Sequence, residues 1–100
     1  MRLTKQQLDV IKQVLFKHFG EGSELRLFGS RADDNARGGD IDLYIRPSQL
    51  FEDVFAKKID FLVTLEQVIG EQKVDVLIEP RVPDSFRQEV IRSGLLLCKR

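Results

Sequence analysis

Residues 27–45 read LFGSRADDNARGGDIDLYI and contain two strand patterns joined by a polar connection. Polar and apolar residues alternate over 24–28, which is typical of a short strand, and the Gly-Ser pair at 29–30 predicts a turn. The polar residues 31–39 end in two glycines and are expected to form a loop. Strict alternation returns over 40–46 and stops at a proline, which indicates a second strand.

The same periodicity, followed outward, predicts an α/β (α+β) fold with the order α-β-β-α-β-α-β. Thr4 and Gln7 form a capping-box pattern at the start of the first helix, and Gly20 suits its end. The simplest arrangement is a mixed sheet of about four strands with the helices packed on one side. The expected elements are a helix over 4–19, strands over 24–28 and 40–46, helix over 50–69, a strand over 73–79, a helix over 83–92 and a strand over 95–98.

The apolar stripe of the 50–69 segment covers about half of the helix circumference at ~100° per residue, more than one buried face requires. This segment is either one long helix that keeps a surplus apolar face for a partner or two abutting helices. For the first alternative we expect the surplus near its start, at Leu50, Phe51, Val54 and Phe55.

The composition is that of one globular domain, which we expect to span residues 1–100. The chain has 100 residues, of which 42% are hydrophobic and 32% charged, with a formal net charge of zero. This balance excludes a disordered chain and gives no reason to expect direct DNA binding. No apolar run is long enough to span a bilayer, and the polar start does not resemble a signal peptide, so we expect a cytoplasmic protein without a membrane partner.

One cysteine and one histidine restrict the chemistry further. Cys98 excludes an internal disulfide and any CxxC motif, and His18 makes an imidazole-rich zinc site improbable. We expect His18 to be a structural residue in the last turn of the first helix, where a partly positive imidazole suits the dipole. Cys98 is expected to be a small buried hydrophobe, and Tyr44 a packing residue.

The candidate chemistry lies on two strands. Asp40 and Asp42 point to the face opposite Ile41 and Leu43, with backbones ~6.5–7 Å apart. No cationic side chain alternates with them along the strand, so a hard cation such as Mg²⁺ would relieve their repulsion. If the strands over 40–46 and 73–79 pair, Asp75 joins them. Three convergent carboxylates are a common scaffold for one or two Mg²⁺ ions that act on a phosphoryl group.

The turn just before this strand supplies the complementary donors. Gly29 lets the backbone approach a phosphate, and Ser30 adds a hydroxyl. Arg31 or Arg37 could add charge-assisted contacts to the outer phosphates. A lone Asp-x-Asp or Gly-Ser is more often an ordinary surface feature, but their combination with Val-Asp-Val on a further strand favours a nucleotide and metal site.

With these motifs, LFGSRADDNARGGDIDLYI and KVDVLI, the chain resembles the minimal nucleotidyltransferases of the DNA polymerase β-like superfamily over residues 4–98. The resemblance implies the nucleotidyltransferase fold. It also implies that Gly29, Ser30 and Arg31 bind the nucleotide and that Asp40, Asp42 and Asp75 are catalytic and ligate Mg²⁺. Many relatives have serine directly before the first aspartate where this chain has Gly39, a difference in the loop rather than in the ligands.

The resemblance further implies an Mg²⁺-dependent enzyme that transfers a nucleoside monophosphate, AMP from ATP, to an acceptor hydroxyl. Minimal members of this kind commonly act as antitoxins that adenylylate a tyrosine of an all-helical HEPN-type toxin, which would be the partner in a hetero-oligomer. Two alternatives stay open. The chain could be a non-catalytic binding module that neutralises a helical partner by contact. An antibiotic-modifying adenylyltransferase subunit is less favoured, because no appended acceptor domain is present.

Overall fold

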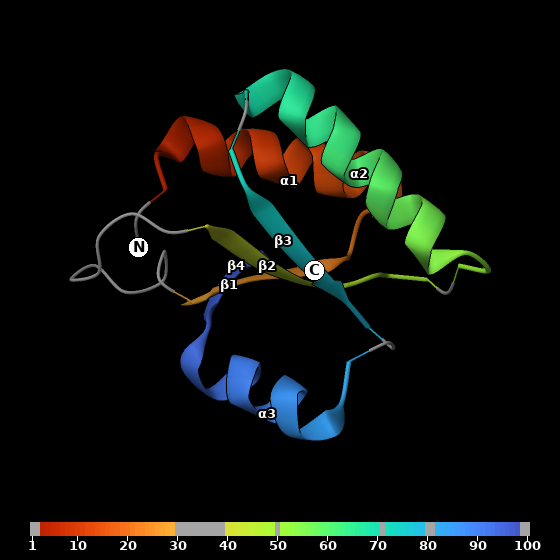
Figure 1. Ribbon diagram of the computed structural model, residues 1–100, viewed down its shortest axis with the longest axis vertical. Helices are drawn as coiled ribbons and strands as arrows, with labels where there is room; N and C mark the ends of the chain where they lie inside the picture. The colour runs from red at the N-terminus through yellow and green to blue at the C-terminus, as the bar shows by residue number, and fades with distance from the viewer. Residues whose placement is uncertain (1–2, 30–39, 50, 71, 80–81, 99–100) are drawn as a thin grey trace.

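The computed structural model describes residues 3–29, 40–49, 51–70, 72–79 and 82–98. It confirms the predicted order of elements (Figure 1). None of the helices in these ranges combines the length and apolarity needed to cross a membrane. The elements are α1 (Lys5–Phe19), β1 (Glu24–Phe28), β2 (Ile41–Arg46), α2 (Val54–Ile69), β3 (Val74–Ile78), α3 (Asp84–Ser93) and β4 (Leu95–Cys98).

The four described strands form one mixed sheet in the order β3-β2-β1-β4. β1 pairs antiparallel with both β2 and β4, whereas β2 and β3 run parallel. A parallel pair needs a long crossover, and α2 provides it. The beginnings of β2 and β3 and the end of β1 therefore meet at the same edge of the sheet, where Phe28 is opposite Asp42 and Asp42 is opposite Asp75.

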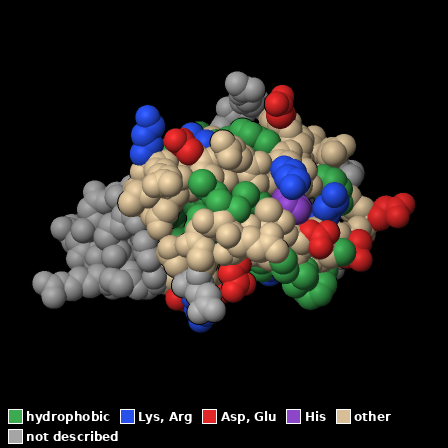
Figure 2. Space-filling view, turned by 90° about the horizontal axis from the view of Figure 1, so that it is seen from above, with side chains coloured by type: hydrophobic (Ala, Val, Ile, Leu, Met, Phe, Trp, Pro, Cys, Tyr) green, Lys and Arg blue, Asp and Glu red, His purple; other side chains and the backbone are tan. Residues whose placement is uncertain are grey.

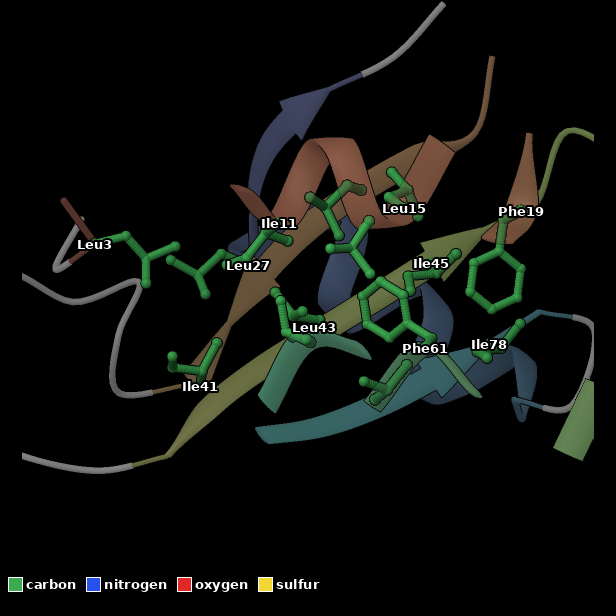
Figure 3. Packing of buried hydrophobic residues seen from close by; sticks show 14 residues of the cluster. Leu3, Ile11, Leu15, Phe19, Leu27, Ile41, Leu43, Ile45, Phe61 and Ile78 are labelled. Atoms are coloured by element: carbon green, nitrogen blue, oxygen red, sulfur yellow. The ribbon is translucent and has the colours of Figure 1, made fainter. Parts of the chain in front are cut away.

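The main core lies between the sheet and the layer formed by α1 and α2 (Figure 3). α1 contributes one stripe of side chains four residues apart, and α2 contributes a pair with the same spacing. The strands contribute every second residue. Burying each large apolar side chain stabilises the fold by about 1.5–3 kcal/mol. The fully buried members include Ile11, Leu15, Phe19, Leu25, Leu27, Ile41, Leu43, Ile45 and Phe61.

The helix caps determine where the first two helices begin. The capping box predicted for α1 is present: the Gln7 backbone N–H donates to Thr4 Oγ1 at 3.0 Å, and the Thr4 N–H donates to Gln7 Oε1 at 3.0 Å. α2 is a single helix, which settles the choice between one and two. It begins at Val54 rather than near residue 50 because the Asp53 carboxylate accepts the Ala56 N–H at 2.9 Å and caps it.

The prediction that the helices pack on one side of the sheet is wrong. α3 lies on the face opposite α1 and α2 (Figure 1). The reason is the apolar content of that second face: Phe28 and Tyr44 both project there, and they need cover. Phe86 of α3 meets Phe28 edge to face, with ring centroids 5.8 Å apart, and Val90 is buried beneath the helix.

Candidate functional site

The parallel register of β2 and β3 brings two of the predicted site residues together. Asp42 and Asp75 are direct register partners, and their side chains project to the same face because pairing residues of adjacent strands share a face. Asp42 is half-buried and Asp75 is exposed. The condition set by the sequence, that these two strands pair, is therefore met, and Asp75 lies beside Asp42 at the edge of the sheet.

Electrostatic repulsion is concentrated on Asp42. Burial raises the pKa of the Asp42 carboxyl, and the negative charges of Asp75 and Asp40 raise it further. The Asp75 carboxyl approaches closely enough to hydrogen-bond the protonated form, which also raises this pKa. A shift of this origin means that ionised Asp42 lacks sufficient positive charge around it.

Asp40 has a cationic partner that the sequence analysis missed. Lys73 Nζ lies 3.4 Å from Asp40 Oδ2, and Lys73 also lowers the pKa of Asp42. The missed signal was available: Ile41 pairs with Val74, so extending the register by one residue puts Lys73 opposite Asp40. Alternation along one strand shows no cation, but the neighbouring parallel strand supplies one.

The three carboxylates do not form a ready-made metal cage. Within the described ranges, no three acidic, His or Cys side chains are arranged so as to hold one metal ion. The donor chemistry nevertheless fits magnesium, since carboxylate oxygens are the ligands that this hard cation prefers. The ammonium of Lys73 at Asp40 and the raised pKa of Asp42 both indicate that this edge favours positive charge.

Gly29 leaves the space that Asp42 uses. Its φ is +73°, a conformation that side-chain-bearing residues rarely adopt. A Cβ atom at this position would overlap Asp42 Oδ2 at a separation that real contacts do not show. The glycine therefore holds the end of β1 directly against the Asp42 carboxylate, so that a group bound by this turn would lie next to that carboxylate.

The remaining nucleotide-binding predictions lie outside the described residues. These are Ser30, Arg31 and Arg37, and they stay predictions. The two ends of this connection are described, and both meet the site: Gly29 contacts the space around Asp42, and Asp40 begins the approach to β2.

Three other side chains have structural roles. Tyr44 is buried under α3, and burial together with the nearby Glu79 raises its pKa. The His18 ring nitrogen Nε2 lies 3.1 Å from Thr64 Oγ1 and links α1 to α2, while burial lowers its pKa and so disfavours the positive imidazole that the sequence suggested. Cys98 is half-buried in β4 and packs against the core.

A separate hollow of about 600 Å³ lies at the opposite end of β2 and β3. Its charged groups largely satisfy one another: Glu79 pairs with Arg46 at 3.5 Å and with Arg87 at 3.2 Å. None of the three site aspartates lines it. The hollow is therefore distinct from the edge of the sheet that carries Asp40, Asp42 and Asp75, called the carboxylate edge below.

The outer side of α2 exposes a row of apolar side chains, formed by Phe55, Ile59 and Val63 and called the α2 stripe below. Successive members are four residues apart, and Phe55 is 68% exposed. Figure 2 looks onto the α1 and α2 layer and shows hydrophobic side chains lying open among charged ones. The expected surplus is thus confirmed for Phe55 but wrong for Phe51, which packs edge to face on Phe19, and wrong for Val54, which is half-buried against the core. Leu50 lies outside the described residues.

The fold is similar to that of several solved toxin–antitoxin structures. A chain of a toxin–antitoxin structure with AMP-PNP matches at 17% identity and a TM-score of 0.76, covering 93% of this chain and 73% of that one. A chain of the solved complex of tri-AMPylated Shewanella oneidensis HEPN toxin with MNT antitoxin gives 16% identity and a TM-score of 0.74. The match covers 98% of this chain and 74% of that one.

The toxin–antitoxin MntA-HepT structure gives 15% identity and a TM-score of 0.72, covering 97% of this chain and 74% of the matched one. No curated protein matches the sequence. A family model described as "Polymerase beta, Nucleotidyltransferase" matches residues 7–100, which is almost the whole chain and includes both strands that carry the aspartates. The chain therefore belongs to the polymerase β nucleotidyltransferase family, and its fold is that of the minimal nucleotidyltransferase antitoxins.

Proposed function

We propose that this chain is a magnesium-dependent adenylyltransferase that moves AMP from ATP to a tyrosine hydroxyl of an all-helical HEPN-type partner and thereby acts as an antitoxin. The observation that carries this proposal is the carboxylate edge: Asp42 and Asp75 in register, Asp40 beside them, and Gly29 packed against Asp42. The family match and the solved neighbours, one tri-AMPylated and one with AMP-PNP, support it.

The reaction joins the acceptor oxygen to the α-phosphorus of ATP and breaks the bond from that phosphorus to the pyrophosphate oxygen. Gly29, Ser30 and Arg31 would bind the phosphates, with backbone N–H groups and the serine hydroxyl as donors. Asp75 would accept the proton that leaves the acceptor hydroxyl. It is suited to this because it is the exposed carboxylate of the edge and so can be reached from outside.

Asp40, Asp42 and Asp75 would hold the magnesium ion or ions. When bound, magnesium supplies positive charge that neutralises the phosphates and offsets the repulsion between the carboxylates. Only the ionised carboxylate is a good ligand, so the raised pKa of Asp42 means that a proton competes with magnesium at this residue.

The partner proposal also has a physical basis in this chain. The acceptor hydroxyl has to be held at the carboxylate edge, and positioning of reactants can account for ~7–11 kcal/mol of a barrier in favourable cases. The α2 stripe offers an apolar surface for such a partner, since exposed apolar area on a small domain commonly marks an interface.

The direct test uses the chain purified together with its helical partner. ATP and Mg²⁺ are added, and intact-mass spectrometry followed by peptide mapping looks for an AMP adduct on the partner. We expect an adduct on tyrosine that is absent with EDTA and absent with Asp42→Asn. A complex that forms stably yet shows no adduct with Mg²⁺ or Mn²⁺ would refute catalysis and favour neutralisation by contact.

A further inference from the structure

We infer that Lys73 is a built-in counter-ion of the carboxylate edge: its ammonium pairs with Asp40 until a divalent cation displaces the ammonium. This inference rests on the proposed metal site and deepens it. It assigns to this chain a device that makes binding of a bare cation weaker than the three carboxylates alone would give.

The first observation is the ion pair itself. Lys73 Nζ lies 3.4 Å from Asp40 Oδ2, with 73% of the lysine side chain and 37% of the aspartate side chain exposed. A pair this open to solvent is held weakly, since exposed ion pairs contribute little to stability. It can therefore exchange for a stronger partner without disturbing the fold.

The second observation is that the backbone fixes this pairing. The Ile41 N–H donates to the Lys73 carbonyl at 3.0 Å, which ties the residue after Asp40 to Lys73 itself. Lys73 directly precedes β3, next to the register pair of Ile41 and Val74, so strand pairing brings its backbone close to that of Asp40.

The third observation concerns the carboxylates as a group. Asp42 and Asp75 face each other in register, whereas Asp40 is paired with Lys73. Coordination of a cation through Asp40 Oδ2 would require this oxygen to give up its lysine partner. A cation also has to approach against the positive charge of Lys73, which acts on Asp42 as well.

The test is a titration with Mn²⁺ alone, followed by the electron paramagnetic resonance signal of the free ion, at low ionic strength. Lys73→Gln removes the charge and should bind Mn²⁺ about 3–10-fold more tightly than the wild type. Lys73→Arg keeps the charge and should bind as the wild type does. Lys17→Gln, in the last turn of α1, is the matched control and should change nothing.

A double-mutant cycle separates displacement of an ion pair from simple repulsion. In an Asp40→Asn background the gain from Lys73→Gln should fall below ~2-fold, because no ion pair is left to break. An undiminished gain in that background would refute the counter-ion role, and so would equal affinities of the wild type and Lys73→Gln. If neither protein binds Mn²⁺, the inference fails together with the proposed metal site, a result that differs from tight but equal binding.

Discussion

Gly29→Ala isolates the contribution of the close approach between β1 and Asp42. Two effects are expected. The backbone at φ +73° becomes strained, which costs about 1–2 kcal/mol for a residue with a Cβ. The new methyl group also displaces the Asp42 carboxylate, because it would overlap Oδ2. Asp42 is half-buried and its side chain can rotate, so this second effect moves a functional group more than it destabilises the fold.

The strain alone predicts a melting temperature about 5–15 °C below that of the wild type. The displaced carboxylate predicts loss of Mn²⁺ affinity and of adenylyl transfer by at least ~100-fold. Circular dichroism melting, Mn²⁺ titration and the adduct assay measure the three quantities on the same protein.

Gly70→Ala is the matched control. Gly70 also has a positive φ, +83°, but a Cβ there meets no atom within 4 Å. It should lose stability by a similar amount, about 1–3 kcal/mol, while Mn²⁺ affinity and transfer stay as in the wild type. Retention of wild-type cation affinity by Gly29→Ala would show that Asp42 is not a ligand at this edge, and the assignment of the site would have to be abandoned.

Asp42→Asn should abolish transfer while raising the melting temperature at pH 7 more than at pH 4. The folded pKa of Asp42 is above its unfolded value, so its stabilising contribution is present at low pH and lost as pH rises through the folded pKa; a smaller gain at pH 7 would contradict this. Calorimetric titration with ATP should show weak or no binding in EDTA and clear binding with Mg²⁺, whereas equal affinity would place the nucleotide elsewhere. Phe55→Glu should prevent complex formation with the helical partner and leave monomer stability nearly unchanged, because this ring is 68% exposed. Val54 is half-buried against the core, so Val54→Glu should destabilise the monomer. A complex unaffected by Phe55→Glu would exclude the α2 stripe as the interface.

Periodicity was sufficient to predict the elements because each is amphipathic with its own repeat. The start of α2 was misplaced because residues 51–55 continue the apolar pattern, while the boundary depends on the Asp53 cap. The face covered by α3 could not be obtained from its own sequence either. An apolar helix stripe shows that the helix needs a surface, and the choice of surface depended on Phe28 and Tyr44 of the sheet.

For the site, alternation along one strand predicted which side chains share a face, but it did not predict contacts between neighbouring strands. Alternation predicted the face that carries Asp42 and Asp75, and the roles of Asp40, Asp42 and Asp75 stay predictions from the family resemblance. The pairing of Lys73 with Asp40 required the register of a parallel pair, which a single strand pattern does not contain. The close approach of Gly29 to Asp42 likewise depends on how the end of β1 meets β2.

The parallel pairing of β2 and β3 also bears on when the site comes into being. The whole of α2 lies between Asp42 and Asp75 in the sequence. Pairing of these two residues therefore carries the entropic cost of closing a long loop. A nascent chain that has emerged only through α2 already contains Gly29, Asp40 and Asp42 but has no strand to place opposite them. The carboxylate edge therefore forms only once β3 has paired with β2, although α3 and β4 still follow in the chain.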